Sequence, residues 1–419
     1  MKNEPNIFCK NLNYKDNELF LDEVSCNRLY EKYGSPLYCY SLKEIREKFI
    51  SFQSIISEFN SKLFYAVKAN YNPKIVSYLA KMGAGADVVS KGEIELVISS
   101  GVKTSNIVFS GVGKSQKEIE FAIDKRIYQI NVESEEELDE IQEVARNKNK
   151  IIEVSLRVNP DVDAYTHRKI STGRIDDKFG IALTKIENIF KKYRNSRWVK
   201  ITGLAIHIGS QITKIKPFSI AFKKLRKLIL LLKEKKYLIK KIDLGGGIGI
   251  VYSSNKVISL EDYKLAIKEN FGDLGVELLF EPGRYLVGSS GILISKVIRV
   301  KKGINNDFLI IDCGMNDLIR PSMYDSYHEV FPVFKKSIQK KTYNIVGPVC
   351  ESGDILGNNR KLQMLKKDDL VVICSVGAYG SCMSSHYNCR IPANEILVEN
   401  KKTFSSNKII KLKNLYKFS

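Results

Sequence analysis

The chain has 419 residues, of which 44% are hydrophobic, and a formal net charge of +20. This length exceeds one typical domain and the composition is ample for a packed core, so we expect a globular protein of two domains. Residues 1–15 are polar, and the most apolar run, 228–232, is far shorter than the ~20 residues of a membrane span. We therefore expect a cytoplasmic protein without a signal peptide or a membrane partner.

The eight cysteines include no C-x-x-C pair, which predicts reduced thiols. The spacing of Cys374, Cys382 and Cys389 fits no zinc pattern, so we expect no metal site. A basic chain can bind nucleic acid, but these lysines are scattered and no nucleic-acid-binding motif appears. We expect no nucleic-acid partner, although a basic surface can gather an anionic substrate or cofactor.

Short apolar runs alternate with segments of helical spacing between about residues 60 and 285. One helical segment, 134–146, begins with Ser134 and Glu137, which are spaced as a capping box. The eight apolar runs are 63–67, 86–89, 107–109, 128–132, 152–158, 203–208, 241–244 and 277–280. Eight β/α units in series predict a (β/α)₈ TIM barrel, with its active site at the C-terminal ends of the strands.

From about residue 286 the pattern changes. Strands are predicted at 292–300, 307–312, 341–346 and 370–376, with turns at Lys302-Gly303 and Gly357-Asn358. Helical spacing is scarce, which predicts a β-rich domain. We expect the α/β barrel at residues 36–285, and a sandwich-like or barrel-like β domain made of residues 1–35 and 286–419.

Lys68 follows the first apolar run and His207 ends the sixth. A lysine at a strand end is costly to bury unless it is paired or used, and a lowered pKa would make it a nucleophile. The alternative is a lysine whose amine reaches solvent. His207 either lies flat on a cofactor ring, with Ser210 reaching a phosphate, or is a structural histidine.

Gly245, Gly246 and Gly247 follow the seventh run, where successive glycines let backbone N–H groups converge on a phosphate. Glu281 and Arg284 follow the eighth run. A buried acid facing a pyridine nitrogen would keep that nitrogen protonated, and an arginine offers a planar fork to a carboxylate or phosphate. The alternative is a salt bridge between these two residues.

Together these groups supply a covalent anchor, a stacking ring, a phosphate cradle and an electron-sink partner, which are a protein's contributions to pyridoxal-phosphate (PLP) chemistry. The set resembles the barrel-type PLP-dependent decarboxylases of ornithine, arginine and diaminopimelate. Three segments resemble the diaminopimelate branch of this family specifically. They are Arg320-Pro321 with Tyr324, Gly347-Pro348-Val349-Cys350-Glu351-Ser352-Gly353-Asp354 and Gly377-Ala378-Tyr379-Gly380. The likeness covers about residues 30 to 400.

The resemblance implies decarboxylation of meso-2,6-diaminopimelate to L-lysine and CO₂, the last step of lysine biosynthesis. It implies that Lys68 binds PLP, that His207 assists catalysis and that Cys350 donates a proton. The implied cofactor contacts are Lys68, His207, Ser210, Gly245, Gly246, Gly247, Glu281, Gly283, Arg284 and Tyr379. The implied substrate contacts are Arg284, Arg320, Tyr324, Glu351 and Tyr379. A head-to-tail homodimer is implied as well, with Cys350 and Glu351 reaching the partner's barrel.

The chain departs from the family pattern in two places. Lys91 stands where the family usually has glycine, which is expected to alter the loop near the cofactor, and the tail Cys389-Arg390-Ile391-Pro392 lacks a second arginine. Two alternative functions are a decarboxylase of carboxynorspermidine or another basic amino acid, and a PLP-binding homologue without catalysis. The Cys-Glu-Ser and Arg-Pro motifs argue against the first, and intact Lys68, Glu281 and Cys350 argue against the second.

Overall fold

The computed structural model describes residues 4–165, 167, 169, 172–174, 176–253, 256–336 and 338–405. They form two compact units. The barrel unit comprises Phe49–Gly249 and Val257–Tyr285, and the β-rich unit comprises the described residues of Met1–Lys48, Ile250–Lys256 and Leu286–Ser419.

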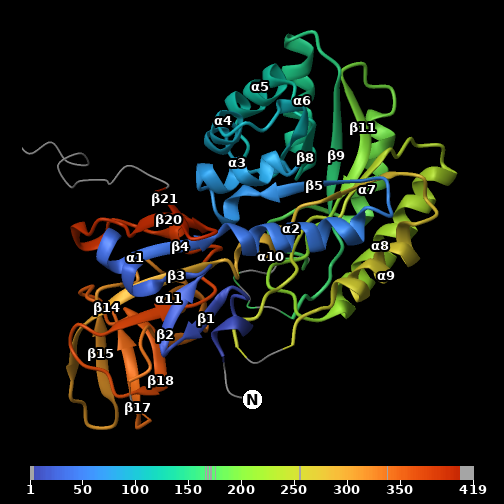
Figure 1. Cartoon of the computed structure of the whole chain (residues 1–419). Helices are drawn as coiled ribbons and strands as arrows, with labels where there is room; N and C mark the ends of the chain where they lie inside the picture. Colours follow the sequence, from blue (N-terminus) through green and yellow to red (C-terminus); the bar gives the residue numbers. More distant parts are fainter. Residues whose placement is uncertain are drawn as a thin grey trace, which may run out of the picture. The chain divides into compact units, whose positions relative to one another are not determined.

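Within the described residues, eight parallel strands close into a barrel, which confirms the predicted fold (Figure 1). Strand β13 pairs with β5 and so closes the ring. A two-residue strand, β10 (Ile181–Ala182), pairs with the end of β9. The barrel strands in spatial order are β5 (Ser61–Ala66), β6 (Gly85–Val88), β7 (Ile107–Phe109), β8 (Gln129–Val132), β9 (Ile152–Asn159), β11 (Val199–Ala205), β12 (Lys241–Asp243) and β13 (Glu277–Phe280).

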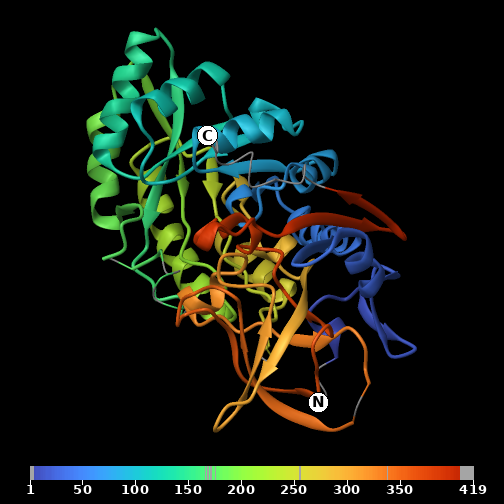
Figure 2. The same ribbon diagram turned by 90° about the vertical axis from the view of Figure 1, so that its left-hand side faces the viewer.

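Helices connect these strands and lie on the outside of the barrel (Figures 1 and 2). A further helix, α2 (Leu42–Ile56), precedes β5, and α10 (Arg284–Val287) follows β13. The connecting helices are α3 (Pro73–Lys81), α4 (Lys91–Ser99), α5 (Gln116–Lys125), α6 (Glu135–Asn147), α7 (Leu183–Tyr193), α8 (Ile215–Glu234) and α9 (Leu260–Phe271).

The predicted capping box at α6 is only half formed. The Ser134 hydroxyl accepts the Glu137 N–H at 3.1 Å, as expected. The Glu137 carboxylate instead accepts the N–H of Glu133 at 3.0 Å and pairs with the Lys114 ammonium at 2.7 Å. Because Lys114 is buried beside it, the carboxylate is held away from the Ser134 N–H.

The β-rich unit contains a three-stranded antiparallel sheet and a larger mixed sheet. Its long strand β14 (Gly291–Lys301) pairs with β4 and β19 through its first half and with β15 through its second half. The small sheet is β1 (Leu12–Lys15), β2 (Glu18–Leu21) and β3 (Val24–Ser25). The other elements are α1 (Cys26–Tyr33), β4 (Leu37–Ser41), β15 (Asp307–Ile311), α11 (Arg320–Tyr324), β16 (Val330–Pro332), β17 (Lys340–Val346), β18 (Ile355–Gln363), β19 (Leu370–Ile373), β20 (Asn394–Glu399) and β21 (Lys402–Ser405).

Two features of this unit differ from the sequence-based expectation. Strand β4 pairs with β14 and β20, so residues 37–41 belong to the β-rich unit and not to a barrel beginning at residue 36. The predicted turn at Gly357-Asn358 lies inside β18. These turn-forming residues lie where the strand is irregular. The register between β17 and β18 shifts here, and Asn359 has a φ of +52°.

Cysteines help to form the core of the β-rich unit. Cys9, Cys26, Cys39 and Cys374 are buried in one cluster with residues such as Leu12 and Ile292. Burial raises the pKa of each of these four thiols. They therefore act as small apolar side chains. Among the residues that the structure describes, no helix has the length and apolar character needed to cross a membrane.

Candidate active site

Lys68 lies in a short 3₁₀ turn, Val67–Ala69, directly after β5. Its Nζ is 2.9 Å from the Oδ2 of Asp87, whose side chain in β6 is fully buried, while one third of the Lys68 side chain is exposed. The negative charge of Asp87 offsets the free-energy cost of partly burying the Lys68 ammonium. Asp87 is a site residue that was not predicted, although an acid inside the apolar run 86–89 was a visible signal.

Two further buried carboxyl groups, Asp243 and Glu281, lie near Asp87. Asp243 ends β12 and Glu281 follows β13, and the Asn131 amide donates to Asp243 Oδ2 at 2.9 Å and to Glu281 Oε1 at 3.4 Å. Burial, followed by the charges of Asp243 and Asp87, raises the pKa of Glu281 well above its usual value, while Lys68 opposes the rise. A carboxyl group in such surroundings keeps its proton. Glu281, which lines the cavity, therefore keeps a proton, and its carboxyl group is hydrogen-bonded to Asp243.

His207 follows β11, and its ring is neutral. Burial, with smaller effects from the charges of Lys68 and Arg157, lowers the pKa of His207 well below its usual value. Its Nδ1 accepts the N–H of Gly246 at 3.2 Å, so the ring proton is on Nε2. An uncharged ring in a fixed orientation is suited to lie against a flat cofactor.

The glycine loop is required by packing. A Cβ on Gly246 would lie 2.3 Å from the Glu281 carbonyl oxygen, and Gly245 and Gly247 have φ values of +63° and +107°. The N–H groups of Gly245 and Gly246 bind Asp243 and His207. These two N–H groups are therefore not directed at a phosphate. The phosphate-binding role of the loop Gly245–Gly247 stays a prediction. At Gly283, a Cβ would lie 3.0 Å from the Cβ atoms of Ala66 and Ala69.

Arg284 is buried and donates from Nε and Nη2 to the Ser210 hydroxyl, at 3.2 and 3.0 Å. Because that oxygen accepts, its own hydrogen remains available for a further acceptor. The pair is suited to bind an anion. Arg284 was expected at either the phosphate or the substrate, and its contact with Ser210, the residue expected at the phosphate, favours the phosphate.

A cavity of about 390 Å³ lies at the C-terminal ends of these strands. It brings together Lys68, His207 and Glu281 from the sequence prediction. Arg157, which the sequence analysis missed, also lines it; its guanidinium is 2.5 Å from Glu133 and 4.9 Å from the centre of the Phe179 ring. An amine, a protonated acid and a neutral imidazole around one such space fit the chemistry of PLP.

The other predicted residues belong to the β-rich unit. Arg320 begins α11 and is buried, and Tyr324 ends this helix. Cys350 and Glu351 are exposed in the loop between β17 and β18, and Tyr379 is partly exposed with a φ of +56°. The Ser322 hydroxyl donates to the Gly353 carbonyl at 2.6 Å, so α11 and the Cys350 loop lie side by side.

The Cys350 loop is held by Asp354. Its Oδ2 accepts the N–H of Val349 at 2.7 Å, and its Oδ1 accepts the N–H of Met315 at 2.6 Å. The N–H of Cys350 donates to Asn388 Oδ1 at 2.8 Å. One buried carboxylate thus links the residue before Cys350 to the segment that leads into α11.

The two departures from the family pattern are accommodated. Lys91 is the first residue of α4, its N–H donates to Glu118 Oε1 at 2.9 Å, and its exposed side chain lies over the Phe121 ring. No positive φ is required there, so a side chain fits. Arg390 donates to the Asp312 carbonyl at 3.2 Å.

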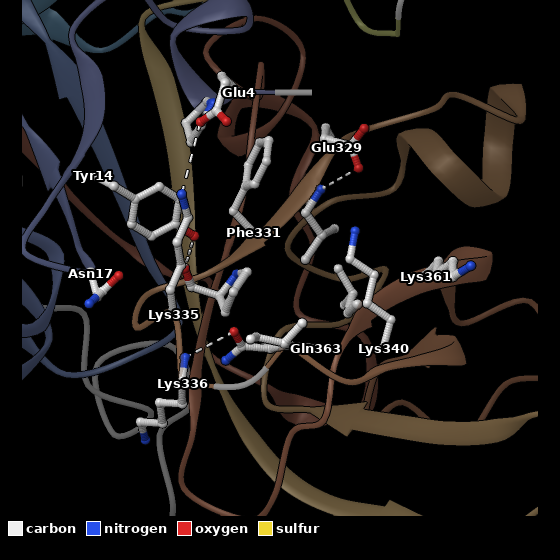
Figure 3. Close-up of a pocket in the computed structure, with 15 residues that line it drawn as sticks. Glu4, Tyr14, Asn17, Glu329, Phe331, Lys335, Lys336, Lys340, Lys361 and Gln363 are labelled. Carbon is white, nitrogen blue, oxygen red and sulfur yellow. Dashed lines mark hydrogen bonds and ion pairs between the residues drawn. The ribbon is translucent and has the colours of Figure 1, made fainter. Parts of the chain in front are cut away.

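A larger cavity, of about 760 Å³, lies within the β-rich unit (Figure 3). Its basic side chains make local contacts. The Lys335 ammonium lies 3.9 Å from the centre of the Tyr14 ring and 4.0 Å from Glu4, and Lys336 pairs with Asp369 at 2.8 Å. The residues that line it include none of the predicted catalytic or binding residues.

Comparisons with known proteins identify relatives of this chain. Residues 42–288 match the family model of the pyridoxal-dependent decarboxylases, pyridoxal binding domain. The chain is 41% identical over 390 residues to diaminopimelate decarboxylase of Aquifex aeolicus, covering 93% of this chain and 92% of the relative. It is 43% identical over 381 residues to that of Neisseria meningitidis serogroup A, covering 91% and 94%.

Solved structures show the same likeness. Diaminopimelate decarboxylase from Helicobacter pylori complexed with L-lysine has a TM-score of 0.90 at 37% identity, covering 93% of this chain and 98% of that one. The enzyme from M. jannaschii in co-complex with L-lysine has a TM-score of 0.93 at 34% identity, covering 98% and 97%.

Fold and site together define a barrel-type, PLP-dependent decarboxylase. Within that class, the chain belongs to the diaminopimelate decarboxylase family.

Proposed function

We propose that this enzyme converts meso-diaminopimelate to L-lysine and CO₂, with PLP bound through Lys68. The observation that carries the proposal is the barrel cavity, in which the Lys68 amine and the protonated Glu281 face one space. Family membership supports the choice of substrate.

The barrel residues hold the cofactor. When bound, PLP supplies an electron sink for the pair released as the Cα–carboxylate bond breaks. Glu281 would keep the pyridine nitrogen of the cofactor protonated, and neutral His207 would lie against its ring. Ser210 and Arg284 would bind the phosphate, beside the loop Gly245–Gly247, in which the N–H groups of Gly245 and Gly246 already bind Asp243 and His207.

Residues of the β-rich unit recognise the substrate. Arg320 and Tyr324 bind the distal carboxylate, and Glu351 binds the distal ammonium. Tyr379 contacts both cofactor and substrate. The Cys350 thiol returns a proton to the Cα that has lost its carboxylate. A site built for both distal charges rejects ornithine, because ornithine leaves the arginine without its anion.

We further propose a head-to-tail homodimer, in which Cys350 and Glu351 of one chain complete the partner's site. The exposure of both residues on this chain supports the proposal. A cytoplasmic location is part of the same proposal, and it is compatible with the free cysteines.

The test is release of CO₂ from meso-diaminopimelate by the purified enzyme with PLP. Borohydride reduction should fix the cofactor on Lys68, and Lys68→Ala should lose both label and turnover. Lys62→Ala is the matched control, since Lys62 lies in β5, the strand directly before Lys68, and has an exposed side chain. Turnover of ornithine or carboxynorspermidine in place of meso-diaminopimelate would contradict the proposed substrate.

A further inference from the structure

The Arg320 guanidinium is oriented by three uncharged neighbours. Its Nη1 lies 3.1 Å from Nε2 of His328, and its Nη2 donates to the Ser326 hydroxyl at 3.2 Å. Its central carbon lies 4.7 Å from the centre of the Tyr252 ring. Together these three contacts fix the orientation of the guanidinium.

His328 makes the most directional of these contacts. The side chain is fully buried, and its Nδ1 lies 2.8 Å from the Cys374 carbonyl oxygen. A carbonyl only accepts, so Nδ1 carries the proton and Nε2 of the neutral ring accepts from Arg320. The ring also packs edge-on against Tyr252, at 5.2 Å between centres and 84° between planes.

A purely structural histidine is the alternative. Against it, the Nε2 lone pair points at the buried arginine that is proposed to bind the distal carboxylate. Tyr252 contacts both residues, so the imidazole and the guanidinium form one packed unit. A rotation of the imidazole would remove the acceptor that fixes Nη1.

We propose that His328 is a positioning residue, which sets the orientation of Arg320 and thereby the selectivity for substrates with a distal carboxylate. The proposal rests on the proposed function, because it takes the role of Arg320 from it. The product defines a useful probe. Since L-lysine is the product, the carboxylate is lost from the D-centre, and L-lysine keeps the end of the substrate that Arg320 would bind. 1,5-Diaminopentane is the same molecule without that carboxylate.

Three variants of His328 separate its two hydrogen bonds in the holoenzyme. His328→Phe keeps a ring but loses both bonds. His328→Gln keeps an acceptor near the Nε2 position, whereas His328→Asn can reach the Cys374 carbonyl but is too short to reach Arg320. For Phe and Asn, we expect the KM for meso-diaminopimelate and the inhibition constant of L-lysine to rise about tenfold or more. For Gln, both should stay within about threefold of the wild type.

In all three variants kcat, PLP absorbance and inhibition by 1,5-diaminopentane should change little, because the barrel site is intact. Cys374→Ala is the matched control. It disturbs the same buried region, but leaves the carbonyl that His328 contacts. It should lower the melting temperature without raising KM. If Phe does not fold, the comparison of Gln with Asn decides.

A double-mutant cycle measures whether His328 acts through Arg320. In an Arg320→Ala background, His328→Asn should cause no further rise in the L-lysine inhibition constant, because its effect is transmitted through Arg320. Additive effects, or equal weakening of L-lysine and 1,5-diaminopentane, would overturn the proposal. A wild-type enzyme that releases no CO₂ from meso-diaminopimelate would instead contradict the proposed function.

Discussion

The carboxylate of Asp87 is fully buried and lies 2.9 Å from the Lys68 ammonium. The pair joins two neighbouring barrel strands, because Lys68 follows β5 and Asp87 lies in β6. It fixes the position of a lysine that lines the cavity.

Asp87→Asn should weaken PLP binding. Without the counter-charge, the amine loses the partner that orients it, and the affinity for PLP should fall by about tenfold. The loss is smaller than for a fully buried pair, because one third of Lys68 is exposed to solvent. Titration of the cofactor-free enzyme followed by visible absorbance measures the effect. Borohydride should still label Lys68, and an unchanged affinity would show that Asp87 does not orient the amine.

Glu93 should make the cofactor-free enzyme less stable as the pH rises. Burial raises the pKa of Glu93 from 4.5 to about 7, with the charge of Asp87 adding to the rise and the Val89 N–H and Lys68 opposing it. Below pH 4.5 the carboxyl is protonated in the folded and unfolded states alike, so it does not affect the free energy of unfolding. Between pH 4.5 and about 7 the folded state binds more protons, so stability falls as the pH increases.

Glu93→Gln removes this dependence, and keeps an oxygen that can accept the Val89 N–H. The variant should melt roughly 2–4 °C above the wild type at alkaline pH, and the difference should vanish toward pH 4.5. Calorimetry of both proteins across this range is the measurement. A difference that is constant with pH would rule out titration of Glu93 as its cause.

Asp354→Ala should release the Cys350 loop. The variant loses the acceptors of the Val349 and Met315 N–H groups, which leaves two buried donors without partners and should cost about 2–4 kcal/mol. We expect a large fall in kcat, because the thiol is no longer held, while PLP absorbance stays. The control is Glu31→Ala, at an exposed carboxylate in the helix α1 of the same unit. A normal kcat in a destabilised Asp354→Ala enzyme would mean that the loop position does not limit turnover.

Local patterns predicted the barrel well, because each strand–helix unit has its own apolar periodicity and the eight runs match the eight observed strands. They failed at β4 and β18. Strand β4 reads like the start of a β/α unit, and its membership of the β-rich sheet depends on pairing with residues 250 or more positions away. The turn residues in β18 are explained by a register shift that local sequence does not reveal.

Site residues at strand ends were predictable by the same logic, since a charged or glycine residue after an apolar run is conspicuous. Their supporting partners were not. Asn131, Asp243 and Arg157 lie inside runs that read as ordinary strand, and His328 follows a polar turn. Their roles depend on contacts between strands distant in sequence, such as Asn131 with Asp243 at 2.9 Å.

Mixed dimers test whether Cys350 acts in the partner's site. Lys68 is on the barrel unit and Cys350 is in the β-rich unit. Lys68→Ala and Cys350→Ala enzymes should each be nearly inactive. After equal mixing and subunit exchange, half of the dimers are hybrids, and in each hybrid one site has both residues while the other has neither. Roughly a quarter of the wild-type activity should therefore return.

Mass spectrometry of differently tagged chains confirms the exchange, and a mixture of Lys68→Ala with Lys68→Ala,Cys350→Ala serves as the control that should stay inactive. The recovered activity should have the wild-type KM, because each restored site contains a complete set of residues. If hybrids form and no activity returns, Cys350 acts within its own chain. In that case each site of a hybrid is built from one chain, so one site lacks Lys68 and the other lacks Cys350.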